Sequence, residues 1–180
     1  VALRFELTVP FARFTAQHKE ELYFPFKRYH ISKVWRGEKP QAGRYREFVQ
    51  CDFDTVGSDS AVSDFETLSL MKAALSAIGV DEIKIHVNHR GIFNRFLKKL
   101  GLSEKSEDIL RAVDKIAKVG EEKVSAELEE ITGNADSSAK IIDYIKPLSS
   151  FEETLSHIEE LAGGEDEDSK RMKTIFSMMK

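Results

Sequence analysis

Apolar and polar positions alternate in four short stretches of the chain, and each alternation predicts a β-strand. These stretches are residues 1–9, 26–36, 44–56 and 82–89. A loop rich in Gly, Pro and basic residues separates the second stretch from the third. We therefore expect these two to form an antiparallel pair joined by a long basic loop.

Apolar residues at helical spacing predict helices between and after the strands. In the first hundred residues these are 10–20, 59–78 and 91–101. Thr8 is expected to cap the first helix, and Gly79 and Gly101 are expected to end the other two. Beyond residue 101 only helical patterns follow, over residues 106–120, 121–132, 137–146, 150–164 and 169–180.

This change of pattern predicts an α+β fold in two parts. Residues 1–100 are expected to form an antiparallel sheet with flanking helices, and residues 101–180 an all-helical module. The apolar stripe of Phe93, Phe96 and Leu100 is expected to be helix core. The Met-rich last helix is expected to dock on the other helices, although it also has the amphipathic character of a helix that binds a partner groove.

The 180 residues, of which 41% are hydrophobic and 32% charged, are typical of a soluble globular protein. Neither a long apolar run for a membrane span nor a signal region is seen, so we expect no membrane association and a cytoplasmic location. Cys51 is the single cysteine, which excludes an intrachain disulfide and a four-cysteine zinc site. It is expected to be a buried, small apolar residue.

The distribution of charge is more informative than the net charge of -4. Between residues 27 and 46 one acid, Glu38, accompanies seven basic residues: Lys27, Arg28, Lys33, Arg36, Lys39, Arg44 and Arg46. So local a concentration favours a defined phosphate site over a nonspecific nucleic-acid surface. Residues 163–169, "GGEDEDS", are expected to be an exposed, mobile acidic loop.

One face of the third stretch has the chemistry of a ligand site. Because side chains two apart point the same way on a strand, one face presents Arg44, Arg46, Phe48, Gln50, Asp52 and Asp54. Arg36 can join this face if the strand register allows. Such a face can stack a planar base on the phenyl ring and bind phosphate with guanidinium groups. The alternative is a solvated face with cross-strand ion pairs.

The order of these residues resembles a known motif. "WRGE", followed after a loop by "RYREFVQCD", is similar to motif 2 of class II aminoacyl-tRNA synthetases. Within that class the segments "LRFELTVPFARF", "KPQAGRYREFVQ" and "VQCDFDTVG" resemble the histidyl-tRNA synthetase family. The resemblance is specific from Leu3 to about Gly57 and thins to helical character after residue 101.

The resemblance implies a role for each matching residue. It implies ATP contacts by Arg36, Glu38, Arg44 and Phe48, with Arg36 as the catalytic residue at the α-phosphate. It implies contacts to the substrate L-histidine by Glu6, Thr8, Gln50 and Asp54, and to the acceptor end of tRNA(His) by Gln41 and Arg46.

The implied reaction is activation of histidine by ATP to histidyl adenylate, followed by transfer to the tRNA 3′ end, with Mg²⁺ bridging the ATP phosphates. The family's motif 1, motif 3 and anticodon-binding domain do not match this chain. We therefore expect an inactive fragment of a homodimeric catalytic domain, in which residues 101–180 are a helical insertion that lies against the acceptor stem.

Three alternatives remain open at the level of sequence. The first is a non-catalytic synthetase paralogue, such as one that resembles the regulatory subunit of ATP phosphoribosyltransferase. The second is an interaction or RNA-binding module built on the helical part. The third is a metal site at His86 and His89, which their spacing supports only weakly, so no metal-ligating residue is expected.

Overall fold

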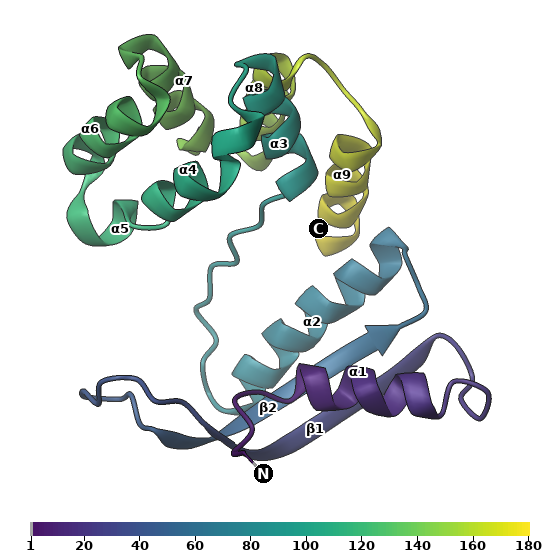
Figure 1. Cartoon of the computed structure of the whole chain (residues 1–180). Coiled ribbons are helices and arrows are strands. Elements are labelled where there is room, and N and C mark those ends of the chain that lie inside the picture. Colours follow the sequence, from purple (N-terminus) through teal and green to yellow (C-terminus); the bar gives the residue numbers. More distant parts are fainter. Residues whose placement is uncertain (1) are drawn as a thin grey trace. The chain divides into compact units, whose positions relative to one another are not determined.

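The computed structural model of the chain describes residues 2–180, which divide into two compact units, one ending at Ile83 and the other starting at Lys84. The first unit is a two-stranded antiparallel sheet with two helices, and the second contains helices alone (Figure 1). The α+β class with an antiparallel sheet is therefore confirmed. The boundary between the units precedes α3 (Arg90–Lys99), because α3 packs on α8 (Phe151–Ala162) in the second unit.

The sheet of the first unit is the predicted hairpin. Strands β1 (Phe26–Trp35) and β2 (Glu47–Val56) pair along their whole length, with Phe26 opposite Val56 and Trp35 opposite Glu47. The intervening loop turns at Gly43, which has a φ of 72° that favours glycine. Gln41 and Arg44 bridge across this turn.

The two helices of the first unit pack on opposite faces of the hairpin. Helix α1 (Thr8–Gln17) lies on the face of the even-numbered residues, where Phe11 contacts Phe26 at 6.0 Å between ring centroids. Helix α2 (Ala61–Ala77) lies on the odd-numbered face, where Lys27 pairs with Glu66. Ser60 caps α2 by accepting a hydrogen bond from the Val62 N–H, 3.0 Å away.

Two predicted strands are wrong. Residues 2–7 form no strand: a single backbone hydrogen bond from Trp35 to the Arg4 carbonyl ties them to β1, and the Arg4 side chain bonds Lys33 and Ser32. Residues 80–89 also have no regular structure. A strand needs a neighbour for its backbone hydrogen bonds, and the described sheet contains only β1 and β2.

The helices of the second unit agree closely with the predicted segments. After α3 and a short 3₁₀ turn, η1 (Ser103–Lys105), they are α4 (Ser106–Val113), α5 (Ile116–Val119), α6 (Glu121–Thr132), α7 (Ala135–Ile145), α8 and α9 (Glu167–Met179). The acidic segment 163–169 is not a free loop. Asp166 caps α9 in a capping box with Ser169, and it forms an ion pair with Arg95.

A single aromatic and aliphatic core holds the second unit together. Phe93 and Phe96 of α3 are almost fully buried, as predicted, and Phe96 stacks on Tyr144 of α7 with ring centroids 4.6 Å apart. Helix α9 docks on α8 through Phe176, whose ring stacks on Phe151. This confirms the expectation that the Met-rich helix packs on its own neighbours.

No helix within residues 2–180 is both long enough and apolar enough to cross a membrane.

Candidate functional site

The even-numbered face of the hairpin gathers the predicted site residues. In the observed register each even residue of β1 lies opposite an even residue of β2, so both sets project from one face. The pairs on this face are Arg28 with Asp54, His30 with Asp52, Ser32 with Gln50 and Val34 with Phe48. Arg36 extends the pairing by one step, because its N–H donates to the Arg46 carbonyl at 2.9 Å. The predicted placement of Arg36 on this face is confirmed.

Arg36 lies between two aromatic rings. Its guanidinium carbon is 4.8 Å from the ring centroid of Phe5 and 5.1 Å from that of Phe48, which are cation–π distances. Its Nη2 donates to Oε1 of Gln50 at 3.3 Å, and its Nε donates to the Phe5 carbonyl at 3.4 Å. Both hydrogen bonds are long, so a phosphate oxygen can compete for the same donors.

Beside Arg36 the loop encloses a small cavity of about 230 Å³. Its walls include Arg36, Glu38, Arg44 and Phe48, which are the four predicted ATP contacts. Arg44 and Glu38 form an ion pair across it. Because Arg36 already approaches one face of the Phe48 ring, a planar base must stack on the other face of that ring or displace the guanidinium.

Glu6 caps α1, a role expected of Thr8. Its carboxylate accepts hydrogen bonds from the backbone N–H groups of Thr8 and Val9, the latter at 2.8 Å. These donors, led by that of Val9, and the positive charge of Arg36 lower the pKa of Glu6. A carboxylate at this point also lies at the positive end of the helix dipole.

The cap predicts a pH dependence for α1. Because the folded-state pKa of Glu6 is lowered, its stabilising effect is complete above the ordinary carboxyl range and is lost as the pH falls through the lowered value. A carbon-detected NMR titration of the side-chain carboxyl should give a midpoint below the reference value of 4.5. A midpoint at or above that reference value would show that the cap does not form.

The four predicted histidine contacts fall into two groups. Gln50 bonds Arg36 and Asp52, and Glu6 lies next to the Phe5 carbonyl that Arg36 also contacts. Thr8 and Asp54 line a separate groove of about 450 Å³ between α1 and β2. Asp54 is four residues along β2 from Gln50, a separation of about 13 Å along a strand.

Asp54 has a partner in the protein. The Arg28 Nη2 atom lies 2.8 Å from Oδ2 of Asp54, and the side chains are only 11% and 25% exposed. Arg28 also donates to the Leu7 carbonyl at 3.2 Å and stacks over the Phe11 ring at 4.0 Å. Arg28 therefore links α1 to the sheet and holds Asp54 in the groove.

We expect the Arg28–Asp54 pair to be energetically coupled. In a double-mutant cycle of Arg28→Gln and Asp54→Asn, the coupling free energy should be about 1–2 kcal/mol, because the pair is largely withdrawn from water. Chemical unfolding of the four variants measures it. The exposed pair Lys33–Glu47, 2.6 Å apart on the other face, should give about 0.5 kcal/mol or less. Equal coupling free energies for the two pairs would contradict the role of the Arg28–Asp54 pair in linking α1 to the sheet.

The two residues predicted to contact tRNA lie in the exposed loop. Gln41 and Arg44 exchange backbone hydrogen bonds of 3.3 and 2.9 Å, and the Arg46 Nε donates to the Glu38 carbonyl at 3.2 Å. The side chains of Gln41 and Arg46 are exposed. They are available to a partner that approaches the loop from solvent.

Phe5 and Arg28 are site residues that the sequence did not single out. Phe5 reaches Arg36 from a segment that is not a strand, so no alternation rule could place it. Arg28 lies opposite Asp54, and the shared even parity of the two strands would have indicated this pair once the hairpin register was known.

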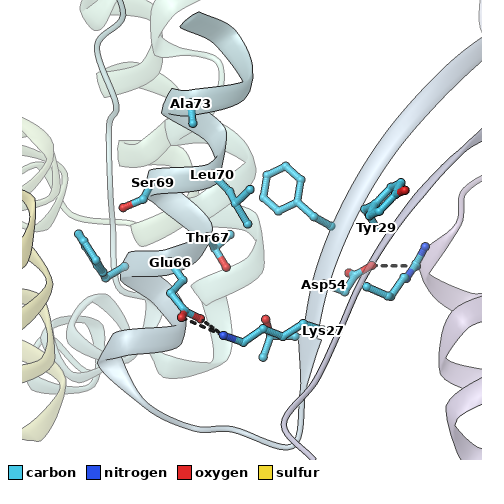
Figure 2. Close-up of a pocket in the computed structure, with 12 residues that line it drawn as sticks. Lys27, Tyr29, Asp54, Glu66, Thr67, Ser69, Leu70 and Ala73 are labelled. Carbon is cyan, nitrogen blue, oxygen red and sulfur yellow. Dashed lines mark hydrogen bonds and ion pairs between the residues drawn. The ribbon is translucent and has the colours of Figure 1, made fainter. Parts of the chain in front are cut away.

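The larger groove of the first unit lies on the odd-numbered face of the sheet, beneath α2. It has a volume of about 620 Å³, and most of its lining surface is apolar, with Tyr29 and Leu70 among the lining residues (Figure 2). Lys27 and Glu66 form an ion pair there, in which Nζ of Lys27 lies 2.8 and 2.6 Å from the two carboxylate oxygens of Glu66. Asp54 is the one predicted site residue among its lining, so the groove is not the site of the predicted chemistry.

Cys51 is exposed, so its predicted burial is wrong. It lies on the odd-numbered face of the sheet, which α2 covers only in part.

No group of three or more His, Cys, Asp or Glu side chains within residues 2–180 has the arrangement of a metal site. His89 instead caps α3, its Nδ1 accepting a hydrogen bond from the Gly91 N–H at 3.2 Å.

Comparison with known proteins identifies the family to which the chain belongs. The family model described as histidyl-tRNA synthetase matches residues 1–179. The histidine–tRNA ligase of Treponema denticola is 63% identical and aligns with 100% of this chain and 41% of its own length. The enzyme of the same name from Rhodopirellula baltica is 47% identical over 92% of this chain and 38% of its own. A crystal structure of histidyl-tRNA synthetase from Nostoc sp. PCC 7120 superposes with a TM-score of 0.85 at 31% identity, covering 98% of this chain and 42% of that one.

An antiparallel hairpin with flanking helices, in a chain of which 98% superposes on a histidyl-tRNA synthetase structure, defines part of a class II aminoacyl-tRNA synthetase core. The chain belongs to the histidyl-tRNA synthetase family. It spans about two fifths of the length of these relatives.

Proposed function

We propose that this chain forms the motif 2 half of the active site of a histidine–tRNA ligase. The observation that supports the proposal most strongly is the position of Arg36, whose guanidinium lies between Phe5 and Phe48 with only long hydrogen bonds to the protein. An arginine held in this way is oriented before a ligand arrives. Binding of the ligand therefore does not have to order this side chain, which favours affinity.

In the proposed reaction a histidine carboxylate oxygen attacks the α-phosphorus of ATP, and the bond to the bridging oxygen of pyrophosphate breaks. Arg36 donates to the α-phosphate oxygens, on which negative charge grows in the transition state. Arg44 binds the outer phosphates, while Glu38 and Phe48 hold the adenine by hydrogen bonding and stacking. Mg²⁺ bound by the phosphate oxygens offsets their charge.

The histidine contacts divide by the end of the ligand that they are proposed to bind. Glu6, Thr8 and Gln50 are proposed to bind the α-amino group, and Asp54 the imidazole end. The carboxylate of Glu6 is held ionised by its backbone donors, which suits a partner with a positive charge. Arg28 lies against Oδ2 of Asp54, and a carboxylate has further lone pairs with which to accept an N–H of the ligand.

In the second step a ribose hydroxyl at the 3′ end of tRNA(His) attacks the histidyl carbonyl and displaces AMP. Gln41 and Arg46 are proposed to contact the acceptor end from the exposed loop, and residues 101–180 are proposed to be the family's helical insertion. A protein of the relatives' full length is proposed to carry out this chemistry as a homodimer in the cytoplasm. The 180-residue chain alone is proposed to be inactive.

The test uses a protein of the relatives' length that contains this chain. Exchange of labelled pyrophosphate into ATP should depend on histidine and should not occur with other amino acids. Exchange without amino-acid selectivity, or no exchange by a folded dimer, would refute the ligase proposal. A non-catalytic paralogue is the second candidate, and it predicts a folded dimer that shows no exchange.

A further inference from the structure

A cavity in the second unit is lined by hydrogen-bond donors. It has a volume of about 450 Å³, and its lining residues are Asn94, Arg95 and Lys98 of α3 with Ser103 and Ser106 from the turn that starts α4. Asn94 and Lys98 are four residues apart, so they lie on the same side of α3. No carboxylate is among the lining residues.

The donors around this cavity are largely unused. Within residues 2–180, Asn94, Lys98, Ser103 and Ser106 donate no side-chain hydrogen bond, and Lys98 makes no ion pair. Most other lysines of the same unit have an acceptor: Lys99 donates to the carbonyls of Glu160 and Leu161, and Lys105 donates to that of Ile131.

Arg95 adds a second, independent observation. Its Nη1 lies 3.1 Å from the Asp166 carboxylate, but its Nε and Nη2 atoms are buried and have no hydrogen-bond partner in the described part of the chain. Leaving charged donors buried and unpaired is costly. An anion in the cavity can bind these donors if the guanidinium turns toward it, which would give Arg95 the acceptors that it lacks.

The charges near the cavity favour a small anion. Lys98 and Arg95 contribute two positive charges and Asp166 offsets one of them, while Glu104 and Lys105, between the two serines, offset each other. Glu107 and Asp108, in the first turn of α4, are engaged by Arg111. Two hydroxyls, an amide and two cationic groups match the several acceptor oxygens of a tetrahedral phosphate better than a single carboxylate.

We propose that this cavity is a phosphate-binding site, separate in sequence and in structural unit from the hairpin face. The ligand is a phosphate group, whether of a free phosphate compound or of a nucleic-acid backbone. Lys98 supplies the mobile charge, the hydroxyls of Ser103 and Ser106 donate to the oxygens, and Arg95 turns its free donors toward the anion.

Titration of the chain with inorganic phosphate at constant ionic strength, followed by amide NMR shifts, tests the site. The shifts of residues 94–106 should saturate. Lys98→Gln should weaken binding roughly tenfold, and Ser103→Ala severalfold. Lys123→Gln removes an exposed lysine from α6 of the same unit and should leave the affinity unchanged. Shifts that do not saturate, or equal losses in Lys98→Gln and Lys123→Gln, would overturn the proposal.

A second arm identifies the source of the phosphate. A short RNA duplex is titrated at several salt concentrations into the unmodified chain and into Lys98→Gln. If the site takes a backbone phosphate, the RNA displaces inorganic phosphate, and the substitution lowers the slope of log affinity against log salt by about one. If it takes a free phosphate compound, inorganic phosphate binds as above and the RNA neither competes nor responds to the substitution.

Discussion

Replacing Arg36 by alanine should reduce histidine-dependent ATP–pyrophosphate exchange by about 10³-fold in a protein of the relatives' length, an effect typical of losing one preorganised donor to transition-state charge. The loss should fall mainly on kcat, with a smaller rise in KM for ATP, because the charge that Arg36 meets is greatest in the transition state. Steady-state exchange kinetics with varied ATP separate the two constants.

Arg36→Lys is the informative second variant. Lysine keeps the charge but cannot lie flat between the Phe5 and Phe48 rings or present two parallel donors. It should therefore recover only a minor part of the lost rate. Near-complete recovery would mean that charge alone matters and that the aromatic clamp is incidental.

Two controls make the result specific. Arg13→Gln removes an exposed arginine of α1 and should leave exchange unchanged. Calorimetric titration with ATP and Mg²⁺ should show weakened binding for Arg36→Ala in a chain whose circular dichroism is unaltered. A folded Arg36→Ala protein that retains full exchange activity would contradict the role of this residue.

The part of this site that could be predicted is the part that depends on local sequence. Side-chain direction alternates strictly along a strand, so Phe48, Gln50 and Asp54 had to share a face wherever β2 lay. The placement of Arg36 on that face depended on the register, and the register followed from two strands of equal length joined by one loop.

The contact of Phe5 with Arg36 could not be predicted, because the two residues are distant in sequence. Phe5 meets Arg36 because the Arg4 side chain bonds β1 where a strand ladder was expected. The helix begins at Thr8, earlier than expected, so Thr8 is its first residue and the Glu6 carboxylate accepts from the N–H groups of Thr8 and Val9. The alternation at residues 82–89 is real, but a strand forms only beside a partner, and periodicity contains no information about partners.

The helices of the second unit were predictable because a helix does not depend on a distant partner. Their hydrogen bonds are internal, and their apolar stripes show which side is buried. The unexpected feature is the acidic segment before α9, where Asp166 serves as a cap and as the partner of Arg95. Composition alone suggested a solvated loop, whereas the capping pattern of Asp166 and Ser169 indicates the start of a helix.

Replacing Phe96 by alanine should lower the free energy of unfolding of the second unit by about 3–5 kcal/mol. The side chain is 1% exposed and its ring stacks on that of Tyr144 at 4.6 Å with an angle of 18°, so the substitution removes both buried area and an aromatic contact. Phe96→Leu keeps most of the volume and should cost roughly 1–2 kcal/mol. Phe14→Ala, at a position 45% exposed on α1, should leave the stability of the second unit unchanged.

The two units offer separate optical probes for this experiment. Far-ultraviolet circular dichroism is dominated by the helices of the second unit, whereas the one tryptophan, Trp35, lies at the end of β1 in the first. In urea, Phe96→Ala should move the circular dichroism midpoint to lower denaturant, and the change in the Trp35 fluorescence midpoint should be much smaller. A loss below about 1 kcal/mol would show that the second unit repacks around the missing ring. Equal shifts of both midpoints would show that the units unfold as one cooperative body, and the stability of the Arg36 face would then depend on the helical core.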